Sequence, residues 1–239
     1  MITTNSIDLR KKVADKVVSE KNLTGLCAQV VLVLDRSGSM DHLYNSGFVQ
    51  RLVERLVPIA MQFDDNGEME MYLFQNNVKK FPYGINTKNV DGLIKREITE
   101  SKYSYGGTYY APPINQIVKD YVQMEKKGGF FGLGKSTANT TDPVYVIFIT
   151  DGENSDRDAA EKAITEASKY GIFFQFVGIG NASFKFLDAL DTMEGRFVDN
   201  ANFFQANDLD SLSDEELYER LLNEFPDWIN KARNLNIIK

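Results

Sequence analysis

The chain has 239 residues, of which 43% are hydrophobic and 26% are charged, so one sizeable core is possible. Its formal net charge of −7 argues against nucleic-acid binding, which needs a basic face that displaces counterions. The same charge weakens the case for binding an anionic membrane.

Residues 1–25 are predicted to form a helical flank before the main domain. Charges occur throughout residues 1–20, without the uninterrupted apolar core of a signal peptide. No apolar stretch approaches the roughly 20 residues that span a bilayer. The single cysteine, Cys27, permits no internal disulfide, favours a reducing compartment and is expected in the core. We therefore expect a cytoplasmic protein.

From residue 26 onward, short β-branched runs alternate with amphipathic helical stretches. This pattern is typical of a mostly parallel sheet with helices on both faces. The first expected strand, residues 28–34, is almost entirely apolar, as a strand buried on both faces must be. We therefore predict one α/β domain over residues 26–239. Further strands are expected at 69–74, 78–81, 144–149, 172–177 and 196–204, and helices at 46–63, 90–98, 114–124, 157–169, 184–190 and 214–224, the last capped by Ser213.

Oxygen-bearing side chains follow the first strand directly, in the run Asp35-Arg36-Ser37-Gly38-Ser39-Met40. Ligands of doubly wound sheets collect at the carboxyl ends of strands. Alternate side chains of an extended loop point the same way. We therefore expect Asp35, Ser37 and Ser39 to face one point, and all three offer the oxygen ligands that Mg²⁺ prefers.

Two further oxygen ligands are expected at loops of the same kind. Thr108 lies in Gly106-Gly107-Thr108, before a helix that opens at Ala111-Pro112, where proline is favoured. Asp151 follows the strand that ends at Thr150. The carboxylates of Asp35 and Asp151 would balance a divalent cation, and the three hydroxyls would add ligands without further negative charge. Nearby acids are expected instead to cap the following helix: Glu153, Asp156 and Asp158.

These five residues resemble the metal-ion-dependent adhesion site of von Willebrand factor A (VWA) domains, with DxSxS, a later threonine and a later aspartate in order. Further blocks between about residues 26 and 204, such as Gly107-Thr108-Tyr109-Tyr110-Ala111-Pro112, resemble the VWA proteins of the bacterial tellurium-resistance (Ter) stress system. The resemblance implies a Rossmann-like VWA fold and a bound Mg²⁺ or Mn²⁺. It also implies that a Glu or Asp of a partner protein takes the sixth metal position.

We therefore expect a non-enzymatic, metal-dependent protein-binding module of such a stress system. The surface around the metal is expected to include Met40, His42, Tyr109 and Tyr110. An enzyme is the alternative, but a phosphatase of the haloacid-dehalogenase type acting through Asp35 would want an aspartate at position 37. A calcium buffer is disfavoured, because two carboxylates and three hydroxyls suit the acid-rich calcium shell poorly.

Residues 129–136, Gly-Phe-Phe-Gly-Leu-Gly-Lys-Ser, match the Walker A pattern GxxxxGK[ST] and suggest a nucleotide hydrolase as a second enzymatic alternative. A phosphate loop, however, joins a buried strand to the N-terminus of a helix. Here a predicted helix precedes the glycines, and a segment of poor helix propensity follows them. We interpret residues 126–142 as a surface loop whose Phe130 and Phe131 either pack on the body or anchor a partner.

Overall fold

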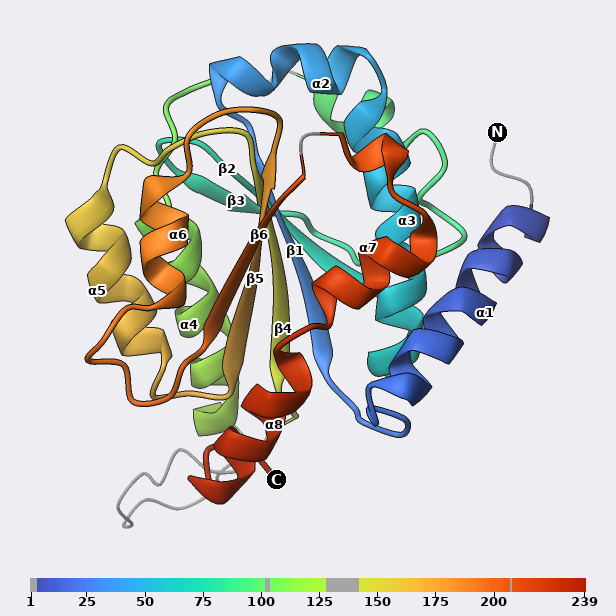
Figure 1. Ribbon diagram of the computed structural model, residues 1–239. Helices are drawn as coiled ribbons and strands as arrows, with labels where there is room; N and C mark the ends of the chain where they lie inside the picture. Colours follow the sequence, from blue (N-terminus) through green and yellow to red (C-terminus); the bar gives the residue numbers. More distant parts are fainter. Residues whose placement is uncertain (1–3, 102–103, 128–141, 207) are drawn as a thin grey trace.

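The computed structural model describes residues 4–101, 104–127, 142–206 and 208–239. Its centre is a six-stranded sheet in the order β3-β2-β1-β4-β5-β6, with helices on both faces (Figure 1). Every strand pair is parallel except β2 with β3. The predicted α/β architecture is therefore confirmed. The strands are β1 (Gln29–Asp35), β2 (Met69–Phe74), β3 (Val78–Lys80), β4 (Val144–Thr150), β5 (Ile172–Ile179) and β6 (Ala201–Ala206).

Eight α-helices occur in the described ranges, divided between the two faces of the sheet (Figure 1). One face carries α1, α3, α7 and α8, and the other carries α4, α5 and α6. In this part of the chain, no helix is long and apolar enough to cross a membrane. The helices are α1 (Thr4–Glu20), α2 (Asp41–Asn45), α3 (Phe48–Phe63), α4 (Ala111–Lys127), α5 (Arg157–Ala167), α6 (Lys185–Asp191), α7 (Asp214–Leu221) and α8 (Phe225–Asn234).

The near-continuous apolar run of β1 serves two hydrophobic cores. Alternate side chains of a strand point to opposite faces of the sheet. Val30 and Leu32 therefore enter the cluster under α1, α3, α7 and α8, whereas Val31 and Val33 enter the cluster under α4, α5 and α6. Val17 of α1 is also buried in the first cluster. The division into a flank of residues 1–25 and a domain of residues 26–239 stays a prediction.

Several element boundaries differ from the expected ones. The predicted helix 46–63 starts only at Phe48, because Gly47 has a φ of 75° and separates α2 from α3. The predicted helix over 90–98 is shorter and irregular, because it begins only at Leu93 and continues as a π-helical turn (Lys95–Thr99). The last strand begins at Ala201, later than predicted.

The C-terminal region holds two helices where one was predicted. Ser213 caps α7 as expected, because its side chain accepts from the backbone N–H of Glu216 and the Glu216 side chain accepts from that of Ser213. The chain then turns and begins α8, with Pro226 in its first turn. Cys27 precedes β1 and is exposed, so its predicted place in the core is wrong. The Walker-like run 129–136 lies outside the described residues.

Candidate metal centre

The strand order brings the carboxyl ends of β1 and β4 to the topological switch point of the sheet. The chain passes from β1 to β2 on one side, and β4 later pairs with β1 on the other. The loops after β1 and β4 therefore leave in opposite directions, which opens a crevice where α/β sheets bind ligands. Asp35 is the last residue of β1, and Asp151 directly follows β4.

Four of the five predicted ligands form one hydrogen-bonded cluster at this crevice. The backbone N–H of Ser37 donates to Asp35 Oδ1 at 2.6 Å. The Oγ atoms of Ser37 and Ser39 are 3.1 Å apart, and Ser39 Oγ donates to Asp151 Oδ1 at 2.7 Å. Two loops that are 112 residues apart in the chain thus bring Asp35, Ser37, Ser39 and Asp151 together.

The loop that carries Thr108 lies beside this cluster. Ser37 forms an isolated parallel bridge with Gly106, and the Gly38 N–H donates to the Gly106 carbonyl at 3.2 Å. The Thr108 carbonyl accepts from Ser155 N at 2.8 Å. In the part of the chain that the structure describes, the Thr108 hydroxyl makes no hydrogen bond to the other four predicted ligands. Backbone contacts thus bring the Thr108 loop to the cluster.

The turn between β2 and β3 holds this loop in place. Asn76 Oδ1 accepts from the Gly107 N–H at 2.8 Å. A Cβ at Gly106 would lie 1.7 Å from Gln75 Oε1 and 2.4 Å from Asn76 Oδ1, so glycine permits the close approach. Gln75 and Asn76 were not predictable from the sequence as supporting residues, because only the fold shows that the two loops meet.

Burial makes both carboxylates of the cluster costly to charge. Asp35 is fully buried, and desolvation raises its pKa to about 7, while hydrogen bonds from Thr150 and Ser37 lower it. Thr150 Oγ1 donates to Asp35 Oδ2 at 2.6 Å. Desolvation also raises the pKa of Asp151. No Lys or Arg within the described ranges forms an ion pair with either carboxylate, so a divalent cation would supply charge that the protein does not.

Two residues expected on the surface around the metal are buried instead. Met40 and Tyr110 have no exposed surface. The Tyr110 ring packs against Phe148, and its hydroxyl donates to the Gly152 carbonyl at 2.6 Å. Tyr110 therefore stabilises the loop after β4 from the core side. His42 is exposed, and Tyr109 is half-buried.

Asp156 caps a different helix from the one expected. It precedes α5, but its side chain makes no capping hydrogen bond there. Its carboxylate accepts from the N–H groups of Tyr110 and Ala111 at 2.9 and 2.8 Å. It therefore caps α4 and ties the segment after Thr108 to the loop after β4. Glu153 forms an ion pair with Arg157 of α5, which agrees with a role in the first turn of that helix.

A pocket of about 340 Å³ lies directly beside Asp151. Its walls include His42, a second acid, Asp208, and three apolar side chains, Leu43, Phe48 and Ile179. A carboxylate that approached the cluster would therefore lie next to a mainly apolar hollow.

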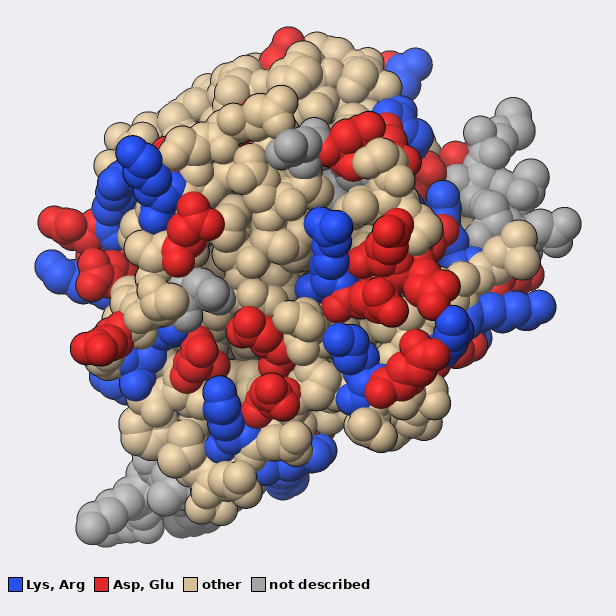
Figure 2. Space-filling view, viewed as in Figure 1, with Lys and Arg blue, Asp and Glu red and all other residues tan. Residues whose placement is uncertain are grey.

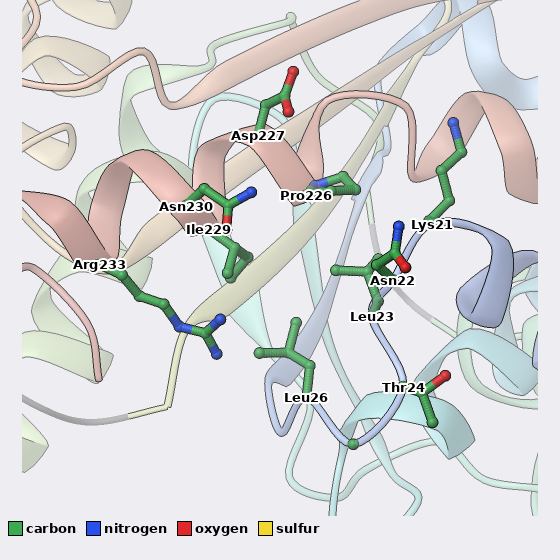
Figure 3. Close-up of a pocket in the computed structure, with 11 residues that line it drawn as sticks. Lys21, Asn22, Leu23, Thr24, Leu26, Pro226, Asp227, Ile229, Asn230 and Arg233 are labelled. Carbon is green, nitrogen blue, oxygen red and sulfur yellow. The ribbon is translucent and has the colours of Figure 1, made fainter.

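A second pocket, of about 330 Å³, contains none of the predicted ligands. It lies between α8 and the segment that follows α1 (Figure 3). Lys21 and Asp227 point away from this space, whereas the Arg233 side chain extends into it (Figure 3). Arg233 already donates to the Lys239 carbonyl at 2.9 Å, so its guanidinium is partly satisfied within the chain.

A family model described as the vWA domain found in the TerF C terminus matches residues 27–238. The chain belongs to this VWA family. Uncharacterized protein YcbR of Bacillus subtilis (strain 168) is 36% identical over 236 residues, which cover 98% of this chain and 90% of that protein. The family resemblance predicted from the sequence is thus confirmed.

Solved structures share the VWA fold at low sequence identity. Manganese-loaded TRAP protein of Plasmodium vivax has a TM-score of 0.53 and 15% identity, covering 84% of this VWA chain and 73% of that one. A von Willebrand factor type A protein of Catenulispora acidiphila has a TM-score of 0.51 and 14% identity, covering 84% and 42%. The VWA chain therefore spans less than half of the Catenulispora structure.

Proposed function

We propose that the cluster at the switch point binds Mg²⁺ or Mn²⁺ and that the VWA domain uses the ion to bind a protein carboxylate. The residues that would hold the ion are Asp35, Ser37, Ser39, Thr108 and Asp151. The observation that carries this proposal is the cluster itself, in which two desolvated carboxylates and two hydroxyls converge without a Lys or Arg partner among the described residues. The manganese reported for the TRAP protein supports the choice of ion.

The composition of the cluster suits an ion that keeps affinity for one more anionic ligand. Two carboxylates neutralise a divalent cation, and hydroxyls add hard oxygen ligands without charge. When bound, the ion would supply an electrophilic position for a carboxylate oxygen of a Glu or Asp. The role of this chain is to fix the ligands, exclude Lys and Arg from the cluster and shape the surrounding surface.

The surface near the cluster suits a protein partner. Charged side chains gather over α7 and α1, whereas few occur over α2, at the top of the view (Figure 2). The apolar pocket beside Asp151 lies next to α2 through His42 and Leu43. We infer that the partner presents an acidic residue flanked by an apolar side chain, and that Tyr109 and His42 contact it.

VWA domains are in general non-enzymatic interaction modules, and we propose the same for this chain. Both oxygens of Asp35 already accept hydrogen bonds, from Ser37 N and Thr150 Oγ1, and its side chain is fully buried. This environment suits a metal ligand better than a nucleophile of a phosphatase. The TerF-like family membership supports a role in a bacterial tellurium-resistance or related stress-response system.

Affinity capture with immobilised protein tests the proposal. We expect wild type to retain a partner from a bacterial lysate in Mg²⁺ and to release it in EDTA. Asp151→Ala should not capture it, whereas Asp158→Ala, which removes an exposed acid of α5, should behave as wild type. Changing one Glu or Asp of the partner to its amide should abolish binding. Equal capture by Asp151→Ala, or in EDTA, would show that the domain binds through another face.

A further inference from the structure

Arg36 lies between two predicted metal ligands, yet its side chain belongs to a different environment. Its guanidinium carbon is 3.7 Å from the ring centroid of Tyr105 and 4.6 Å from that of Tyr44. The residue is only 4% exposed. Among the residues that the structure describes, its Nε and one terminal nitrogen, Nη1, have no hydrogen-bond partner. A buried guanidinium stays charged, and leaving its donors unpaired is costly, so these donors need an acceptor from outside.

The same guanidinium lines a pocket of about 250 Å³ at the carboxyl end of β2. Lys79 of β3 also lines it, together with the polar residues Gln75 and Ser104. No Asp or Glu is among the described residues around this pocket. The aromatic rings hold the guanidinium in place, and the charged groups among the described residues of the pocket wall are all cationic. An anion is therefore the ligand that this pocket fits.

The shape and place of the pocket favour the carboxylate of a protein side chain. Part of its wall is apolar, formed by Leu73, Phe74 and Val78, which suits the methylene groups of a glutamate. The guanidinium fork matches the planar geometry of a carboxylate. Asn76 of the adjoining turn also holds the Gly107 N–H of the Thr108 loop, so pocket and cluster lie at the same edge of the sheet.

We propose that Arg36 and Lys79 form a second acidic-residue subsite for the same partner that completes the metal. One acidic residue of a partner segment would bind the ion, and a second would enter the pocket and accept from the Arg36 guanidinium. This inference rests on the proposed metal-dependent function. It adds a specificity rule, because the domain would select segments with two suitably spaced acids over segments with one.

Synthetic peptides test the rule without knowledge of the natural partner. Glycine–serine peptides would carry either one glutamate or two, separated by one to four residues, and calorimetry in Mg²⁺ would measure their affinities. We expect the best two-glutamate peptide to bind about tenfold more tightly than the one-glutamate peptide, which corresponds to one charge-assisted pair. Arg36→Met should reduce that ratio to about one, and Arg36→Lys should restore part of it. Lys88→Met, which removes an exposed cation elsewhere, should keep the full ratio.

Nuclear magnetic resonance of the arginine Nε–H groups provides a readout that does not depend on a folded Arg36→Met variant. Acetate should shift the Arg36 signal in wild type and also in metal-free protein, because the pocket uses no metal ligand. A two-glutamate advantage that survives in Arg36→Met, or an Arg36 signal that acetate does not move, overturns the subsite. A larger shift with inorganic phosphate than with acetate contradicts the choice of a carboxylate. If the one-glutamate peptide binds equally in EDTA, the proposed metal function fails. The subsite is then tested only by whether acetate shifts the Arg36 signal.

Discussion

Replacing Asp35 by asparagine should stabilise the metal-free protein at neutral pH and abolish its response to Mg²⁺. Asp35 is fully buried, so its charged form costs free energy when no cation is bound. Asparagine has nearly the same shape, and its carbonyl can accept from the Ser37 N–H that now bonds to Asp35. Its amide can donate to Thr150 Oγ1, whose own proton can turn to the Gly152 carbonyl, 3.3 Å away.

The pH dependence of this effect has a definite sign. Desolvation raises the pKa of Asp35 from 3.8 to about 7 on folding. Between these values the folded state binds more protons than the unfolded state, so the free energy of unfolding of the metal-free wild type falls as pH rises. The stabilisation of the metal-free wild type by the proton on Asp35 is complete below pH ~4 and lost above pH ~7. At about 1.4 kcal/mol for each pKa unit, the loss is about 4 kcal/mol, and Asp35→Asn does not undergo it.

Urea unfolding in EDTA from pH 4 to 8 measures the effect as a difference between the two proteins. Asp64, whose pKa burial also raises, titrates in both and cancels. Asp158→Asn, a change at an exposed position, serves as the control and should parallel wild type. Mg²⁺ at a hundredfold excess over its dissociation constant should then stabilise wild type by about 2.7 kcal/mol and Asp35→Asn by nothing. A variant that is less stable than wild type in EDTA at pH 8, or that responds equally to Mg²⁺, refutes the reasoning.

Three further changes separate the parts of the site and the fold. Thr108→Ala should weaken Mg²⁺ binding less than Asp151→Ala in calorimetric titration, because water can replace a neutral hydroxyl; equal losses would contradict this ranking. Gly106→Ala should displace Gln75 and Asn76 and reduce Mg²⁺ affinity severalfold with a small change in melting temperature, whereas an unchanged affinity would show that this close contact is dispensable. Ser213→Ala should lower the free energy of unfolding by about 1 kcal/mol through loss of the α7 cap and leave Mg²⁺ binding intact; a change in Mg²⁺ affinity would be the contrary result.

The sequence predicts the sheet well because its strands are short apolar runs bounded by polar turns. The predicted range 69–74 coincides with β2, and the predicted start of β4 at Val144 is correct. Helix boundaries are less predictable, because apolar spacing persists where the backbone changes. The predicted helix 46–63 runs through Gly47, yet the positive φ of that glycine separates α2 from α3. Pro226 was an available signal for the start of α8.

The candidate cluster was predictable because its residues lie at the carboxyl end of a strand or in the loop that follows one. The carboxyl ends of β1 and β4 meet in the sheet, so Asp35 and Asp151 approach without any knowledge of side-chain contacts. The surroundings were not predictable in this way. Tyr110 is buried and Asp156 caps α4 because segments far apart in the chain pack together. Local sequence propensity does not predict such long-range contacts. The stacking of Arg36 on Tyr105 has the same origin.

Direct counting of bound Mn²⁺ tests whether Asp35 and Asp151 hold a metal ion. Electron paramagnetic resonance reports free Mn²⁺, so titration of the protein gives the number of bound ions and their affinity. We predict one ion for each wild-type chain, competed by Mg²⁺, and none at this site in Asp35→Ala or Asp151→Ala, with Asp158→Ala equal to wild type. Binding of one Mn²⁺ with unchanged affinity by both Asp35→Ala and Asp151→Ala would show that the ion does not bind at this cluster.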